Sequence, residues 1–209
     1  KGCVVAEGRC KYLTTAAVYG ANSSGKSNLV AALATMKNMV LSSVKLNDHD
    51  PLPYDPFLLS EESSKQPTHL EVLYWDADET RIRYGFEYTM RRIEQEWLFV
   101  GKKNKQEQPF FVRDEEGIGV DENLFPEGVG LEERTNDNRL FLSLVAQLGG
   151  IVSKNVLDYF KSGYNVISGL NNQGYEGLTE RQFLNEKEES ADALQFFKDL
   201  QLGFENIET

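Results

Sequence analysis

The hydrophobic side chains in the middle of the chain occur in short runs separated by polar, turn-forming residues, as in an antiparallel β-sheet. β-branched and aromatic residues dominate these runs, and each run has the length of a single strand. Asp76–Glu79, between the first two runs, has the composition of a hairpin turn. The pattern predicts a meander with the strands His69–Trp75, Arg81–Tyr88, Glu94–Val100 and Phe110–Arg113.

Other hydrophobic residues recur with the spacing of one face of a helix. Leu29, Leu33, Met36 and Val40 lie four, three and four residues apart, which predicts a helix over 27–40. Shorter amphipathic patterns predict further helices over 139–148, 155–161 and 191–200.

The remaining segments have distinct compositions. Residues 12–19 contain β-formers and end at Gly20, so we expect the second half of this segment to be a buried strand. Proline-rich residues 47–67 are predicted to form a surface loop, because proline breaks helices. Residues 114–138 are acidic and irregular, and residues 171–190 have the composition of a polar linker.

Composition and charge exclude several classes of protein. The chain has 209 residues, which suits one domain or a lobe of a larger one. Its 22 Lys and Arg against 33 Asp and Glu give a net charge of −11, which argues against a surface devoted to nucleic acid. One basic strip, Lys102–Lys105, keeps a local DNA contact open.

Cysteine content and hydropathy point to the cytoplasm. Cys3 and Cys10 are too few for a disulfide scaffold or a four-ligand zinc site, which favours a reducing setting. No run reaches the ~20 apolar residues of a membrane-spanning helix, and no signal peptide opens the chain. Because the first residue is Lys1, we expect the sequence to begin inside a longer protein.

One motif has a specific chemical meaning. Residues 20–27, Gly-Ala-Asn-Ser-Ser-Gly-Lys-Ser, match the phosphate-binding pattern G-x-x-x-x-G-K-[ST] between an apolar segment and a helix. The two glycines allow a tight loop whose N–H groups surround phosphate oxygens. The Lys26 ammonium suits the β- and γ-phosphates, and the Ser27 hydroxyl suits Mg²⁺. The alternatives are a chance Gly/Ser turn and a degenerate loop, and the intact lysine and serine argue against the latter.

The extended string over residues 20–28, which ends in Ser-Asn, resembles the ABC-type ATPase heads related to the SMC, RecF and OLD proteins. It is most similar to the prokaryotic AAA-type ATP-binding proteins associated with abortive infection. The resemblance runs from about residue 16 to about residue 170. It includes Pro56–Leu59, Arg83–Glu87 with Glu96–Leu98, and Asn138–Leu144.

The resemblance implies an α/β fold of the P-loop NTPase class. Residues 1–150 would form a β-rich N-terminal lobe with the loop, the antiparallel meander and a helical arm, and residues 151–209 a helical segment leading to a second lobe. In such heads the second lobe holds the signature, the Walker B aspartate, a catalytic glutamate and a switch histidine. Two heads would form a head-to-head homodimer with ATP and Mg²⁺ at the interface. The dimer would drive a partner, a nuclease or toxin, in defence against phage.

The motifs of the second lobe have no clear match in this chain. Val72–Asp76 is nearest to Walker B, but another predicted strand follows it so closely that a hairpin is the better interpretation. Residues 167–174 contain Ser-Gly but lack the Gly-Gly and the following helix of a signature. We therefore expect the second lobe to lie beyond Thr209, and this chain to lack the catalytic glutamate.

The resemblance also implies individual site residues. Gln147 matches by position the glutamine that touches Mg²⁺ and the attacking water, the alternative being a polar residue near the end of an ordinary helix. Asn22 could contact the γ-phosphate or serve only the turn, and Asn28 could be a helix-surface residue. The implied nucleotide ligands are Gly20, Asn22, Ser23, Ser24, Gly25, Lys26, Ser27 and Asn28.

Three functions compete. The leading hypothesis is an ATP-binding head that hydrolyses ATP in the full-length protein. The second is an interaction module in which bound nucleotide only orders the protein for a partner and is not hydrolysed. The third is another P-loop enzyme, a GTPase or small-molecule kinase, which is less favoured because Asn104–Glu107 lacks the aspartate of a guanine-binding motif and no arginine-rich lid is evident.

Overall fold

The structure of the protein is a computed structural model. It divides the chain into two compact units, Lys1–Val166 and Ile167–Thr209. The predicted linker, apart from residue 177, and half of the last predicted helix lie outside the described residues. The structure describes residues 4–7, 10–13, 15–58, 60–76, 78–103, 105–167, 177, 191, 195 and 198–200.

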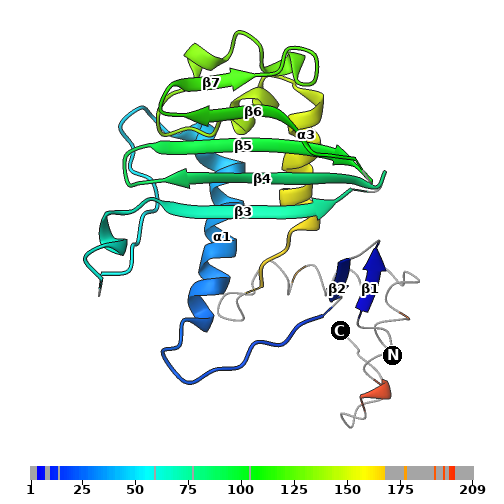
Figure 1. The fold of residues 1–209 in the computed structure, drawn as a ribbon. Helices are drawn as coiled ribbons and strands as arrows, with labels where there is room; N and C mark the ends of the chain where they lie inside the picture. The colour runs from blue at the N-terminus through cyan, green and yellow to red at the C-terminus, as the bar shows by residue number, and fades with distance from the viewer. Residues whose placement is uncertain are drawn as a thin grey trace. The chain divides into compact units, whose positions relative to one another are not determined.

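Five antiparallel strands form the main sheet of the first unit (Figure 1). Each strand pairs with the next along the chain, which confirms the predicted meander. The last strand was not predicted, because it is short and contains two glycines. The strands are Thr68–Trp75 (β3), Thr80–Tyr88 (β4), Ile93–Lys102 (β5), Gln108–Asp114 (β6) and Gly117–Val120 (β7). A separate hairpin pairs Val4–Glu7 (β1) with Cys10–Leu13 (β2).

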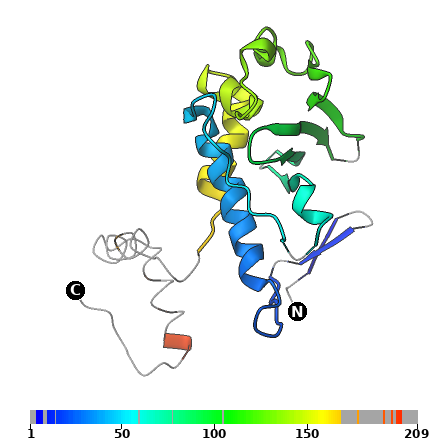
Figure 2. The same cartoon turned by 90° about the vertical axis from the view of Figure 1, so that its left-hand side faces the viewer.

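Helices pack on one face of this sheet. The long helix α1, Lys26–Ser42, and the shorter α3, Ile151–Asp158, lie on the same side of the sheet in two perpendicular views (Figures 1 and 2). Helix α2, Phe141–Gln147, contacts the same layer through the Phe141 ring, which meets the Phe111 ring edge-on at 5.0 Å. The helices over 27–40 and 139–148 are thus confirmed. Among the described residues, no helix is both long and apolar enough to cross a membrane.

The strand expected just before the phosphate-binding motif is wrong. The observed strand ends at Leu13, and residues 15–20 are exposed coil, with Val18 63% and Tyr19 91% exposed. A strand needs a hydrogen-bonded neighbour, and no described strand pairs with this segment. β-propensity alone therefore does not decide its conformation.

The first half of α1 also lacks cover. Met36 and Val40 are buried as its spacing predicts, but Leu29 is 51% and Leu33 40% exposed. The helix is therefore anchored to the core through its second half, and its first half stands clear of the described core.

A buried carboxylate joins the sheet to α2. Glu96, on β5, is fully buried, and its oxygens accept hydrogen bonds from the N–H groups of Phe141 at 2.7 Å and Leu142 at 3.0 Å. The Tyr84 hydroxyl donates to the same carboxylate at 2.9 Å, and Arg113 supplies a nearby positive charge. The first N–H groups of a helix lack intrahelical acceptors and attract negative charge, so a strand residue acts as the cap that α2 does not have locally.

The beginning of α2 is also fastened to the end of α1. The Ser143 hydroxyl donates to the Val40 carbonyl at 2.7 Å, and the Leu140 N–H donates to the Ser43 hydroxyl at 3.3 Å. All four residues are buried, so water does not compete for these bonds. The start of α2 is therefore bonded both to the end of α1 and, through Glu96, to the sheet.

A second long-range cap holds α3. The Glu127 carboxylate accepts from the N–H of Val152 at 3.0 Å and from the N–H and hydroxyl of Ser153 at 2.8 and 2.7 Å. This helix was predicted over 155–161, but it begins at Ile151 and ends in a π-helical turn, Tyr159–Gly163. The cap explains the early start, because it satisfies N–H groups that the local sequence leaves open.

Removing the Glu96 carboxylate should destabilise the fold strongly. Glu96→Ala leaves two helix N–H groups and a tyrosine hydroxyl without their acceptor and removes the negative charge near the buried Arg113, so we expect the free energy of unfolding to fall by about 3–5 kcal/mol. Urea unfolding followed by circular dichroism measures this. Gln95→Ala, at the exposed neighbouring residue, is the control and should change it by less than about 0.5 kcal/mol. Similar losses for both variants would contradict the capping role.

The same carboxylate should make stability depend on pH. Burial raises the pKa of Glu96 above its ordinary value of 4.5, against the opposing effect of Arg113 and the hydrogen bonds. The folded state therefore binds the Glu96 proton more tightly than the unfolded chain does. Proton binding at Glu96 adds to the free energy of unfolding at low pH, and this contribution is lost as pH rises from 4.5 through the raised pKa. Urea titrations over this range should show wild type losing stability relative to Glu96→Gln as pH rises. A difference that is constant or grows with pH would contradict this.

Candidate functional site

The motif at residues 20–27 forms a tight loop that ends where α1 begins. The Ser24 N–H donates to the Ala21 carbonyl at 3.3 Å, closing a turn. Ser23 and Gly25 both have left-handed backbone conformations, with φ of 64° and 86°. Gly25 is also the N-cap residue of the helix, a position where a glycine avoids the strain that a side chain would add.

Gly20 is needed for a different reason, the close approach of the loop to itself. A Cβ atom at this residue would lie 2.5 Å from the Ser24 hydroxyl oxygen. Any larger residue would therefore force the Ser24 hydroxyl into another rotamer. Both glycines of the motif thus have physical roles that follow from the backbone path.

The Lys26 side chain folds back over the loop. Its Nζ donates to the carbonyl oxygens of Gly20 at 2.7 Å and Ala21 at 2.6 Å, and to the Ser24 hydroxyl at 3.3 Å. The ammonium thus lies over the turn, held by carbonyl oxygens that an anion could replace. Its charge and the positive end of the α1 dipole act on the same small region.

Backbone donors at the start of α1 are open. The N–H groups of Asn28 and Leu29 donate to the Gly25 carbonyl at 3.0 and 3.3 Å, whereas those of Gly25, Lys26 and Ser27 have no acceptor within the described part of the chain. A hollow of about 170 Å³ lies here, lined by residues 23–28. Open N–H groups at a helix start, beside an ammonium, form an anion site.

The structure separates the predicted site residues into three groups. Ser23, Ser24, Gly25, Lys26, Ser27 and Asn28 line the hollow. Gly20 does not line the hollow, but it leaves room for the Ser24 side chain in the turn. Asn22 is exposed in the turn and does not line the hollow.

Gln147 is not brought to the loop in this arrangement. It is exposed at the last residue of α2, one turn after Ser143, which is bonded to Val40. Val40 lies fourteen residues along α1 from Lys26, about 21 Å at 1.5 Å per residue. Gln147 lies only about 6 Å further along α2 than Ser143, which is too short to span the distance of about 21 Å from Val40 back to Lys26. Gln147 therefore lies far from the loop.

The hairpin interpretation of the nearest Walker B match is confirmed. β3 and β4 pair directly, and Asp76 occupies the turn between them. One Asp76 oxygen accepts from the N–H groups of Asp78 at 2.9 Å and Thr80 at 2.8 Å, as in an Asx turn. Over the described ranges, no three His, Cys, Asp or Glu side chains gather in a group that could hold a metal ion.

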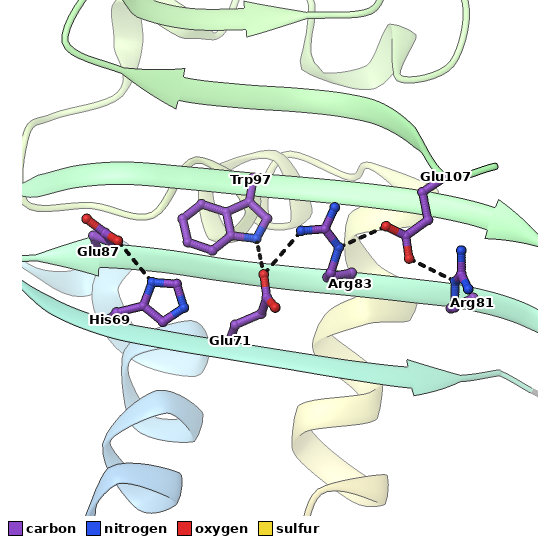
Figure 3. A network of polar contacts seen from close by, with 7 residues as sticks. All are labelled: His69, Glu71, Arg81, Arg83, Glu87, Trp97 and Glu107. Carbon is purple, nitrogen blue, oxygen red and sulfur yellow. Dashed lines mark hydrogen bonds and ion pairs between the residues drawn. The ribbon is translucent and has the colours of Figure 1, made fainter. Parts of the chain in front are cut away.

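A polar network on the outer face of the sheet was not anticipated from the sequence (Figure 3). Glu71, Gly85 and Trp97 lie opposite one another on three strands, and the Trp97 ring fills the space that a side chain at Gly85 would need. The indole N–H donates to Glu71 at 2.8 Å, and Arg83 pairs with Glu71 at 3.4 Å and Glu107 at 2.8 Å. A glycine in the middle of a predicted strand was the available signal.

A model of a known protein family matches most of the chain. A family model described as "AAA domain, putative AbiEii toxin, Type IV TA system" matches residues 16–202. A search of curated proteins and a search of solved structures each found no match. The matched range begins before the loop and extends through all of α1, the sheet, α2 and α3.

Crowding at the loop should weaken its affinity for phosphate chains. Gly20→Ala forces the Ser24 side chain out of its position, so we expect about fivefold weaker binding of inorganic triphosphate in isothermal titration calorimetry. Because Ser24→Ala removes the hydroxyl that clashes, adding Gly20→Ala to Ser24→Ala should weaken binding much less than Gly20→Ala weakens binding by wild type. If Gly20→Ala costs the same affinity in both backgrounds, this account of Gly20 is wrong.

Proposed function

This chain belongs to the AAA-domain family whose model it matches, and from that membership we propose that the loop at residues 20–27 binds ATP with Mg²⁺ as part of an ATPase. The family is one of P-loop NTPases. The observation that carries the proposal is the set of three open N–H groups beside the Lys26 ammonium at the start of α1. Every α-helix begins with such open donors, and what sets this one apart is the Lys26 ammonium that the loop places beside them.

The residues of the loop would divide the work by their chemistry. The N–H groups of Gly25, Lys26 and Ser27 would donate to phosphate oxygens, and the dipole of α1 would add to the attraction. Lys26 would exchange the carbonyl oxygens of Gly20 and Ala21 for phosphate oxygens. Such an exchange replaces each hydrogen bond to a neutral carbonyl oxygen with a charge-assisted bond to a phosphate oxygen.

The Ser27 hydroxyl fits the role of a Mg²⁺ ligand. It is exposed at the hollow and, within the described residues, accepts and donates no hydrogen bond that would have to be broken. A bound Mg²⁺ would neutralise charge on the phosphates. Ser23, Ser24 and Asn28, which also line the hollow, are proposed to complete the phosphate contacts, and Asn22 could reach the terminal phosphate from its exposed position in the turn.

We propose that hydrolysis needs groups beyond this loop. Gln147, the proposed ligand of Mg²⁺ and water, would have to approach the loop through a rearrangement of α2. A second lobe would supply the Walker B aspartate and catalytic glutamate, as in ABC-type heads, and a head-to-head homodimer would enclose the nucleotide. The 209-residue chain alone should then bind nucleotide weakly and turn it over poorly.

The biological role that fits best is abortive infection. The family description names an AbiEii toxin and a type IV toxin–antitoxin system. We propose that the ATPase head drives an effector, a toxin or nuclease, in phage defence. The alternative is a module in which nucleotide orders the protein for a partner without turnover, and a DNA contact at Lys102–Lys105 remains a secondary proposal.

Replacing Lys26 should abolish the main charge at the site. Lys26→Ala removes charge-assisted contacts to the phosphates, so we expect ATP affinity in the presence of Mg²⁺ to fall about tenfold to a hundredfold. Isothermal titration of ATP into the 209-residue chain measures this. Lys45→Ala, at an exposed lysine just after α1, is the matched control and should leave affinity unchanged.

Turnover separates the two functions. In the longest available form of the protein, ATP hydrolysis that is lost in Lys26→Ala supports the ATPase, whereas binding without turnover supports the ordered module. Equal ATP affinity for wild type and Lys26→Ala would overturn the site altogether.

A further inference from the structure

The end of α3 departs from regular α-helical geometry. Residues Tyr159–Gly163 form a π-helical turn, and the Tyr164 N–H donates to the Tyr159 carbonyl five residues back at 2.7 Å. π-turns are rare and strained relative to an α-helix, and they persist where other contacts hold them. Relaxation to an α-helix would shift the bond by one residue and rotate the chain that follows by about 100°.

Aromatic side chains of the sheet pack against the π-helical turn. The Tyr159 ring stacks on Tyr74 of β3 with centroids 3.5 Å apart, and the adjacent Phe160 ring meets Tyr84 of β4 at 6.0 Å. Two consecutive residues of an α-helix point about 100° apart, so both reach the sheet more easily in a wider turn. The contacts to Tyr74 and Tyr84 therefore favour the π register.

A lysine of α1 caps the same turn. Lys37 Nζ donates to the Tyr164 carbonyl at 2.7 Å and to the Lys161 carbonyl at 3.4 Å. A cation at a helix C-terminus is favourable because the last carbonyl groups have no intrahelical donors. Lys37 is the group by which α1 holds the position of Tyr164.

Lys37 lies near the middle of α1, between its exposed first half and its anchored second half. It lies eleven residues after Lys26, about 16 Å along the axis, on one continuous helix. The first half of α1 is poorly covered, whereas Val40 and Ser43 are bonded to α2. Lys37 therefore lies where the uncovered part of the helix passes into the anchored part.

We propose that Lys37 makes the π-helical turn at Tyr159–Gly163 respond to nucleotide at the phosphate loop. A displacement of the first half of α1 changes the distance from Lys37 to the Tyr164 carbonyl, and loss of this bond releases the turn toward the α register. The chain after Tyr164 then leaves α3 in a different direction. The inference rests on the proposed function, because it takes ATP as the signal at the loop.

Amide hydrogen exchange tests both parts of the proposal in the 209-residue chain. Without nucleotide, Lys37→Met, which keeps the aliphatic stem, should raise the exchange rate of the peptide 159–166 about fivefold through loss of the C-terminal cation. With saturating ATP and Mg²⁺, the same peptide should change its exchange rate in wild type and not in Lys37→Met. Lys45→Met is the control and should behave as wild type in both conditions.

The outcomes distinguish this proposal from the proposed function. Unchanged exchange in nucleotide-free Lys37→Met overturns the cap. If calorimetry shows that ATP binds wild type and the peptide does not respond, or responds equally in Lys37→Met, the coupling is overturned while ATP binding stands. If ATP does not bind at all, the proposed function fails and the response to nucleotide fails with it, whereas the nucleotide-free comparison still decides the cap.

Discussion

The rest of the structure depends on one buried carboxylate that a strand contributes to a helix. Glu96 satisfies two backbone donors at the start of α2 and accepts from a tyrosine hydroxyl, beside the buried charge of Arg113. A carboxylate in this position cannot lose its partners without leaving several polar groups buried and unpaired. It thereby fixes α2 against the sheet, and α2 in turn holds the end of α1.

This anchoring is uneven along α1, and the unevenness bears on the site. The second half of the helix is packed and hydrogen-bonded to α2, while the half that begins at the phosphate loop is poorly covered by the described residues. The loop therefore has a local conformation set by its turn and glycines, whereas α1, which supports it, is anchored only in its second half. A helix held in this way can pass small movements of the loop to residues in its middle.

Sequence patterns anticipated the elements whose cause is local or periodic. The meander appeared from short apolar runs, and its turn from Asp76 and its neighbours, because these signals act within a few residues. The strand expected after residue 14 failed because pairing needs a partner that β-propensity does not provide. The start of α3 was misplaced because its cap, Glu127, lies more than twenty residues away in the sequence.

The sequence by itself determined the shape of the phosphate loop. Gly20 and Gly25 permit a backbone path that other residues resist, and Lys26 and Ser27 stand at fixed places relative to it, so eight consecutive residues contain the information. Only the tertiary structure decided which side chains cap the helices, where Lys37 donates, and how Trp97 reaches Glu71 across Gly85. These contacts join residues far apart in the chain, and their energies exist only once the sheet and helices have brought the partners together.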